Sequence, residues 1–145
     1  MVNDYIIFQI STNRAIINVK NIQEIIVRPD KITPILDAQS YVEGLVNLRG
    51  EAIPVIDLRS YLNVEKFNPE ELESSQTILI LKKGDKKLGI IVDAIYHVQQ
   101  LEISDDIMDE NKNTLYNVFF PKVIRMDEEL ISVFDAELVF EETNL

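Results

Sequence analysis

The chain of 145 residues contains no cysteine, one histidine and only four glycines. Without cysteine it can form neither a disulfide scaffold nor a thiolate metal site, and it has no cysteine nucleophile. This composition fits a reducing, intracellular compartment. A single histidine excludes metal sites that need two or more imidazole ligands. Four scattered glycines make no phosphate-binding loop. These absences exclude several large classes of enzyme.

Positive charge is also scarce. The chain has 14 lysines and arginines against 25 aspartates and glutamates, so its net charge is −11 and its pI is near 4.5. Such a chain repels phosphates, which makes anionic membranes and nucleic acid poor partners, including single strands bound by an OB-fold. No hydrophobic run approaches the roughly 20 residues of a membrane span, and no targeting segment is visible. We expect a cytoplasmic protein with no nucleic-acid partner and no direct membrane insertion.

β-Branched residues dominate what is present. Isoleucine occurs 21 times and valine 13 times, against five alanines. These side chains lose rotamer freedom in helices and pack well on sheets. The hydrophobic runs are short and separated by turn-forming residues, which predicts an all-β fold, a small barrel or sandwich. Strands are predicted at residues 5–10, 15–19, 53–56, 78–81, 88–92, 123–124 and 130–134.

Helices are expected to be few and short. Residues 68–71 form a helix start signal, with asparagine as N-cap, proline at the first position and glutamate at the third, and predict a helix through about residue 74. The surrounding segment, about 66–76, has the composition of a linker. Single helical turns are expected near residues 37–43 and after Asp57 and Asp135. The end of the chain leaves little room for a longer C-terminal helix.

The two halves of the chain share a pattern. Residues 45–58 match 123–136 at an offset of 78, and residues 5–10 and 15–25 match 78–83 and 88–98 at an offset of 73. The matches are mostly of apolar character, so chance similarity is the alternative to duplication. The interpretation is a single domain, 1–145, made of pseudo-repeat halves at about 5–65 and 77–140. Units this small are marginally stable alone, so we expect one cooperative body whose halves are able to exchange terminal strands.

No catalytic constellation stands out. A Ser-His-acid triad would need His97, which lies in a strand-like stretch and is expected to be an exposed strand residue. Asp57, Asp93 and Asp135 each follow an apolar strand, where an aspartate usually caps the next turn by accepting a backbone N–H. The enzyme alternative is a small acid hydrolase that uses Asp57 and Asp93. It requires the two carboxyl groups to converge in a pocket within about 5–10 Å.

The segment from Gly44 to Gly50 is the most distinctive part of the chain. A glycine at each end indicates that the backbone turns there or is approached closely. Arg49 precedes the second glycine. It is either a surface arginine whose stem covers the sheet or a planar, always-charged anchor for an interface.

The chain resembles a known family here. The stretch from Tyr41 to Arg59 is similar to the signature segment of the CheW-like chemotaxis adaptors, and residues 21–25, 88–95 and 130–135 resemble other hallmarks of that family. The resemblance covers nearly the whole chain. It implies two small SH3-like five-stranded β-barrels packed together. It also implies a non-enzymatic scaffold, with no cofactor, that couples the cytoplasmic tips of methyl-accepting chemoreceptors to the regulatory domain of the histidine kinase CheA. The alternative is a binding module of another two-component, pilus or secretion system.

The resemblance implies partner-binding roles at six positions: Ile22, Glu24, Gly44, Arg49, Ile91 and Val92. The first two match positions of receptor contact. The glycine matches a place where added bulk disturbs docking, and the arginine matters for coupling within the receptor array. The last two match apolar positions near the kinase interface.

The chain departs from the family at residues 119–122. Phe119, Phe120, Pro121 and Lys122 stand where the family usually has a glycine before its penultimate strand. Proline cannot donate to a strand ladder, so we expect this strand to begin at a sheet edge or a bulge. The two phenylalanines either cover the changed geometry or are exposed and bind a partner.

Overall fold

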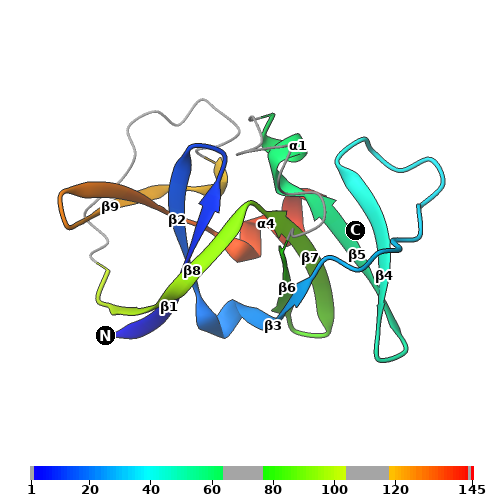
Figure 1. Ribbon diagram of the computed structural model, residues 1–145, viewed down its shortest axis with the longest axis horizontal. Coiled ribbons are helices and arrows are strands. Elements are labelled where there is room, and N and C mark those ends of the chain that lie inside the picture. The colour runs from blue at the N-terminus through cyan, green and yellow to red at the C-terminus, as the bar shows by residue number, and fades with distance from the viewer. Residues whose placement is uncertain (1, 64–76, 104–117, 144) are drawn as a thin grey trace.

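The computed structural model describes residues 2–63, 77–103, 118–143 and 145, and contains two five-stranded sheets (Figure 1). The first sheet has the strand order β8-β1-β2-β10-β9, and the second has the order β3-β6-β7-β5-β4. The strands of the first sheet are β1 (Asn3–Ile10), β2 (Asn13–Asn18), β8 (Ala94–Leu101), β9 (Lys122–Met126) and β10 (Glu129–Val133). Those of the second are β3 (Ile22–Val27), β4 (Val42–Leu48), β5 (Glu51–Asp57), β6 (Thr77–Lys83) and β7 (Lys86–Val92). The predicted all-β class with two five-stranded units is confirmed.

Each sheet takes strands from both halves of the sequence. β1 and β2 join β8, β9 and β10, whereas β6 and β7 join β3, β4 and β5. Exchanging β1 with β6, β2 with β7, and so on through β5 with β10 converts one strand order into the other. The strands from different halves meet in two parallel pairs, β2 with β10 and β5 with β7, and in two antiparallel pairs, β1 with β8 and β3 with β6. The sheets therefore do not coincide with the halves 5–65 and 77–140. The helix and linker expected within 66–76 lie outside the described residues.

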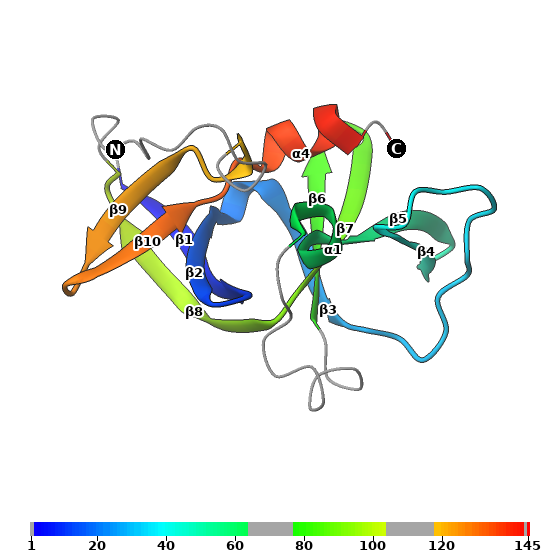
Figure 2. The same cartoon turned by 90° about the horizontal axis from the view of Figure 1, so that it is seen from above.

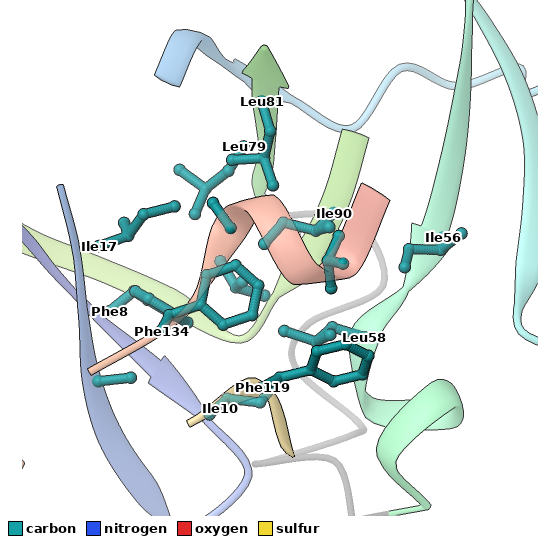
Figure 3. Close-up of a cluster of buried hydrophobic side chains, with 14 of the residues drawn as sticks. Phe8, Ile10, Ile17, Ile56, Leu58, Leu79, Leu81, Ile90, Phe119 and Phe134 are labelled. Carbon is teal, nitrogen blue, oxygen red and sulfur yellow. The ribbon is translucent and has the colours of Figure 1, made fainter. Parts of the chain in front are cut away.

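Three hydrophobic clusters hold the sheets. One lies within the first sheet, one within the second, and the largest lies between them. β6 shows the arrangement, because Ile78 and Ile80 face the second sheet's cluster while Leu79 and Leu81 face the shared one. A strand buried on both faces has a continuous apolar sequence rather than an alternating one. Figure 3 shows side chains from both sheets gathered around the same helix in this shared cluster.

Short helical elements close the fold. The 3-10 helix η1 (Val19–Asn21) leads from the first sheet to the second, α1 (Leu58–Leu62) follows β5, and α4 (Ala136–Thr143) follows β10. The carboxylates of Asp57 and Asp135 accept hydrogen bonds from backbone N–H groups at the starts of α1 and α4, at 3.0 and 3.2 Å. The predicted capping role of these two aspartates is confirmed. No helix in the described part of the chain is long and apolar enough to cross a membrane.

Two expectations about helices are wrong. α4 has eight residues, more than a single turn, although little room was expected for a C-terminal helix. Its Ala136, Val139 and Phe140 are buried in the shared cluster between the sheets, where α4 lies in Figure 2, and this packing stabilises the added turn. Near 37–43 the chain forms hydrogen-bonded turns but no helix: the Val42 N–H donates to the Gln39 carbonyl at 3.0 Å, and β4 begins at Val42.

The unusual segment before β9 belongs to the core. Phe119 and Phe120 are fully buried, so they cover the changed geometry and are not exposed for binding. Their rings pack 5.2 Å from those of Tyr61 and Phe134, respectively. Pro121 immediately precedes β9, which is an edge strand of the first sheet as expected.

Candidate functional site

The edge strand β3 carries the first part of the candidate site. Ile22 and Ile26 are half-buried against the shared cluster and the second sheet's cluster, respectively. Glu24 lies between them, next to an irregularity in the pairing of β3 with β6. Its side chain is 22% exposed. A carboxylate on the inner side of a strand needs a cationic partner close to the surface.

The turn between β4 and β5 supplies that partner. Arg49 and Gly50 both have positive φ, 53° and 85°, which is the geometry of a tight two-residue hairpin turn. The side-chain oxygen of Asn47 accepts a hydrogen bond from the Gly50 N–H at 2.9 Å and holds the turn closed. The Arg49 side chain therefore projects from a rigid turn and is 71% exposed.

Arg49 and Glu24 form a bidentate ion pair. Two guanidinium nitrogens donate to the two carboxylate oxygens at 2.6 and 3.0 Å. The hydrogen bond from Arg49 lowers the pKa of Glu24, and the charge of Lys87 lowers it further, while the same hydrogen bond raises the pKa of Arg49. Two of the five guanidinium N–H groups are used here, and the others have no acceptor among the described residues, so they are able to meet a partner's carboxylate.

This geometry predicts how the pair responds to pH. A carboxylate whose pKa is lowered in the folded protein contributes its interaction at neutral pH and loses it as the pH falls through that pKa. We expect the carboxyl carbon of Glu24 to titrate below pH 4.5 by NMR, and to titrate closer to 4.5 in the Arg49→Ala variant. A wild-type midpoint at or above 4.5 would contradict the ion pair in solution.

Gly44 lies beneath the loop that joins β3 to β4. Its φ is 142°, and a Cβ at this position would collide with the carbonyl oxygen of Thr33. Thr33 and Leu45 exchange two backbone hydrogen bonds, at 2.9 and 2.7 Å, which press the loop against β4. Gly44 is itself buried. Any effect of bulk at this position on docking would therefore act through the loop and not through direct contact.

Ile91 and Val92 lie in the core instead of on a partner surface. Both side chains are fully buried, the first in the second sheet's cluster and the other in the shared cluster. They belong to β7, which lies between β6 and β5 and has no free edge. The Arg49–Glu24 pair thus joins the β4–β5 turn to the edge strand β3, which also carries Ile22, while these two residues lie away from that contact.

Three exposed hydrophobic side chains near this edge were not expected. Ile25 and Val27, on the outer face of β3, are 42% and 69% exposed, and Leu36, in the loop before β4, is 90% exposed. The signal was present in the sequence, because residues 22–27 contain too many apolar residues for a strand with one polar face. Exposed apolar side chains beside a fixed ion pair are typical of protein interfaces.

A hollow of about 300 Å³ opens beside η1, the link from the first sheet to the second. It is lined by Lys20 and Asn21 of η1, by Pro121 and Lys122, and by residues 133–137 at the start of α4. Ile22 directly follows η1, so the hollow and the edge of β3 adjoin. The lining carries two lysines and two carboxylates, Asp135 and Glu137, so its charges balance.

The three residues Asp57, Arg59 and Asp93 form a buried ion triad. The guanidinium of Arg59 donates to Asp57 at 2.8 and 2.9 Å and to Asp93 at 2.9 Å. Burial alone would lower the pKa of Arg59, but the hydrogen bonds and charges of Asp57 and then Asp93 raise it. Asp93 also accepts a hydrogen bond from the backbone N–H of Ser11 at 2.7 Å, which links this triad to the β1–β2 turn of the first sheet.

The buried ion triad argues against the hydrolase alternative. Asp57 and Asp93 do converge, but on a guanidinium in the protein interior, with 1% and 3% of their surfaces exposed. A carboxylate that is hydrogen-bonded to a buried arginine and closed off from solvent can neither protonate nor attack a substrate. His97, the only candidate base, is exposed on β8 as predicted. The carboxylates serve structure, and the exposed edge of the second sheet remains the candidate functional site.

Comparisons with known proteins agree with this architecture. A model of the family described as "CheW-like domain" matches residues 4–144. "Chemotaxis protein CheW" of Thermotoga maritima is 29% identical over 136 residues, which cover 93% of this chain and 85% of that one. The protein of the same name in Treponema pallidum is 30% identical over 145 residues, or 95% and 82% of the two chains. The crystal structure of the scaffolding protein TtCheW from Thermoanaerobacter tengcongensis has a TM-score of 0.75 and 23% identity, covers 93% of this chain and 90% of that one, and shows the same fold.

Proposed function

The chain belongs to the CheW-like domain family of chemotaxis scaffolds, and we propose that it couples chemoreceptor tips to the histidine kinase CheA by binding alone. The observation that carries this proposal is the Arg49–Glu24 pair, exposed on a rigid edge at positions where the family resemblance implies partner contact. Its partners would be the cytoplasmic tip of a methyl-accepting receptor and the regulatory domain of the kinase. It would work in the cytoplasm, beside membrane-anchored receptors.

The edge of the second sheet has the chemistry of a modest interface. Arg49 has N–H donors with no further acceptor among the described residues, and Ile25 and Val27 offer apolar surface on β3, the strand that carries its partner Glu24. Arginine is enriched among residues that dominate binding energy, and a surrounding apolar surface excludes water from it. About 800 Å² per partner suffices for a specific interface, and weaker contacts need less. In an array, many such contacts act together, so each is able to stay weak.

The hollow beside η1 supports a separate place for a receptor helix. It is lined by η1, by β9 and β10 of the first sheet and by α4, so a helix seated there would contact the first sheet and the link that leads to the second. An adaptor transmits a signal only if it binds the two states of its partner differently. A contact with both the first sheet and this link is sensitive to the angle at which a helix crosses them. This supports the proposal that the protein transmits a signal as a change in the geometry of its partners, without a chemical reaction.

The experiment is a titration of isotope-labelled protein, followed by NMR, with a kinase regulatory domain and with a receptor tip fragment. We expect amide shifts along β3 and the β4–β5 turn. Arg49→Ala should weaken binding about tenfold, which is the loss of roughly 1.4 kcal/mol of interaction, while its unfolding midpoint stays that of wild type. Arg125→Ala, at an exposed position on β9 of the first sheet, is the matched control and should bind normally. Wild-type binding by Arg49→Ala would refute the assigned role.

A further inference from the structure

A series of hydrogen bonds leads from the surface of the first sheet to the buried ion triad. The hydroxyl of Tyr96, on β8, donates to the side-chain oxygen of Gln9 at 3.0 Å, and the side-chain nitrogen of Gln9 donates to the carbonyl oxygen of Ser11 at 2.8 Å. The N–H of Ser11 donates in turn to Asp93, which also accepts from Arg59. Tyr96 is 43% exposed, whereas the other members are buried. Together with the triad, these residues form what we call the Tyr96 network.

The Tyr96 network contains nearly all of the buried polar residues in the described part of the chain. Five of the six belong to it, and the sixth, Thr143, bonds within α4. Every buried side-chain polar atom of the described residues has a hydrogen-bond partner. A buried polar group that loses its partner stays dehydrated without compensation, so the contacts of such a network depend on one another. Loss of one contact should therefore affect its neighbours.

The opposite junction of the duplicated fold lacks such a network. The offsets of 78 and 73 place the counterparts of the triad at three other residues: Asp135, Glu137 and Lys20. All three line the hollow beside η1. Among the described residues, Lys20 forms no ion pair with either carboxylate. One junction thus holds together without a buried ion triad, so packing of the fold alone does not explain the network at the other junction.

The β1–β2 turn is the strained member of the Tyr96 network. Ser11 has a φ of 53°, in the left-handed region that residues other than glycine seldom adopt. Side chains hold both of its backbone polar groups, the N–H through Asp93 and the carbonyl oxygen through Gln9. A strained backbone persists only where its surroundings fix it, and such strain is common in switch regions. Release of either contact would let this turn relax into a second arrangement.

The far end of the network reaches the second sheet. The carboxylate of Asp57 accepts from the backbone N–H of Arg59, at the start of α1, at 3.0 Å. The backbone N–H of Asp57 donates to the carbonyl oxygen of Tyr41 at 2.8 Å. Asp57 ends β5 and Tyr41 directly precedes β4, so the contacts extend from β8 of the first sheet to the β4–β5 hairpin of the second.

We propose that the Tyr96 network couples the two sheets, with the strained turn at Ser11 as the element that changes state. Loss of the Tyr96 hydrogen bond leaves the buried Gln9 without one partner and loosens its hold on the turn. The turn then relaxes, its N–H leaves Asp93, and the guanidinium of Arg59 moves with the start of α1. Coupling of this kind is reciprocal, so a change in the triad also alters Tyr96. The coupling goes beyond the proposed adaptor function and does not depend on it.

The test removes the hydroxyl of Tyr96 and leaves its ring in place. In Tyr96→Phe, we expect amide hydrogen exchange at Ser11 to rise about fivefold, as for the loss of one net hydrogen bond. The Nε–H resonance of Arg59 should shift in the NMR spectrum, although Arg59 lies at the other end of the network. The amide of Phe134, bonded to Ile16 outside the network, should exchange as in wild type.

Two further variants serve as controls. Tyr5→Phe removes a hydroxyl from the same sheet, but that hydroxyl has no hydrogen-bond partner among the described residues, so exchange at Ser11 should stay within about twofold of wild type. Ser11→Gly tests the strained turn, because glycine adopts a positive φ without strain. In the Ser11→Gly background, Tyr96→Phe should change exchange at position 11 by less than about twofold.

The same measurements give the results that would overturn the proposal. If exchange at Ser11 and the Arg59 resonance both stay unchanged in Tyr96→Phe, the contacts carry no coupling. A change at Ser11 alone would make the Tyr96 hydrogen bond purely local. An equal effect of Tyr5→Phe would show a general loss of stability, and an equal effect of Tyr96→Phe with and without Ser11→Gly would exclude the strained turn. None of these readouts involves a partner, so they are independent of the proposed adaptor function.

Discussion

Replacement of Arg59 by alanine is expected to lower the free energy of unfolding by about 3–5 kcal/mol, because it leaves two buried carboxylates without their cation. Arg59 is 1% exposed and donates three side-chain hydrogen bonds to Asp57 and Asp93. Since Asp93 also binds the backbone of Ser11, the loss should loosen the contact between the two sheets. Urea unfolding followed by circular dichroism measures the change.

Two control variants distinguish the loss of the buried ion pairs from the loss of side-chain volume or of one charge. Arg49→Ala removes an arginine whose side chain is largely exposed, so its unfolding midpoint should not move. A variant that neutralises the whole triad, Asp57→Asn/Arg59→Met/Asp93→Asn, should recover part of the lost stability, because no unpaired charge remains buried. If Arg59→Ala lowered the free energy of unfolding no more than Arg49→Ala does, the buried triad would be contradicted.

Gly44→Val is expected to destabilise the protein by about 2–4 kcal/mol. The positive φ of 142° disfavours any side chain, and a Cβ here would meet the carbonyl oxygen of Thr33 and lie 2.9 Å from the side chain of Ile32. The loop before β4 must therefore move away, which breaks the two hydrogen bonds between Thr33 and Leu45. Hydrogen exchange at these two amides, with the unfolding midpoint, records the change.

Gly84→Ala is the matched control for Gly44. Both glycines have positive φ, but no atom lies within 4 Å of a Cβ at Gly84, so only the backbone term applies. We expect a cost of about 1 kcal/mol and unchanged exchange at Thr33 and Leu45. If Gly44→Val and Gly84→Ala cost the same, the loop does not press on Gly44. If Gly44→Val is stable yet fails to bind partners, the glycine is part of a docking surface after all.

Much of the fold can be predicted from the residue pattern. The runs at 78–81 and 88–92 are continuous and apolar, and both proved to be strands buried on two faces. The caps at Asp57 and Asp135 were predictable because the carboxylate of an aspartate that follows a strand commonly accepts a hydrogen bond from a backbone N–H of the next turn. α4 was underestimated because eight residues are marginal as a helix alone, and only the shared cluster between the sheets stabilises its second turn.

The candidate site was harder to predict. Glu24 and Arg49 are 25 residues apart, and their pairing depends on β3 and the β4–β5 turn meeting in space. Isoleucine and valine occur both in cores and on exposed strand faces. Only the position of Ile91 and Val92 on a central strand shows that they belong to the core. No role could be assigned to Arg59 from the sequence, because an arginine is rarely buried unless it is paired, and its partner Asp93 is 34 residues away.

Composition and local pattern by themselves determined the all-β class, the turns, the aspartate caps and the acidic surface, because these depend on interactions between residues close in sequence or on a simple count of charges. Only the tertiary structure decided how strands of the two halves interleave, which apolar residues stay exposed, and that Asp57, Arg59 and Asp93 share one buried site. Those outcomes depend on contacts between distant residues, and burial is a property of the assembled sheets that no local stretch of sequence contains.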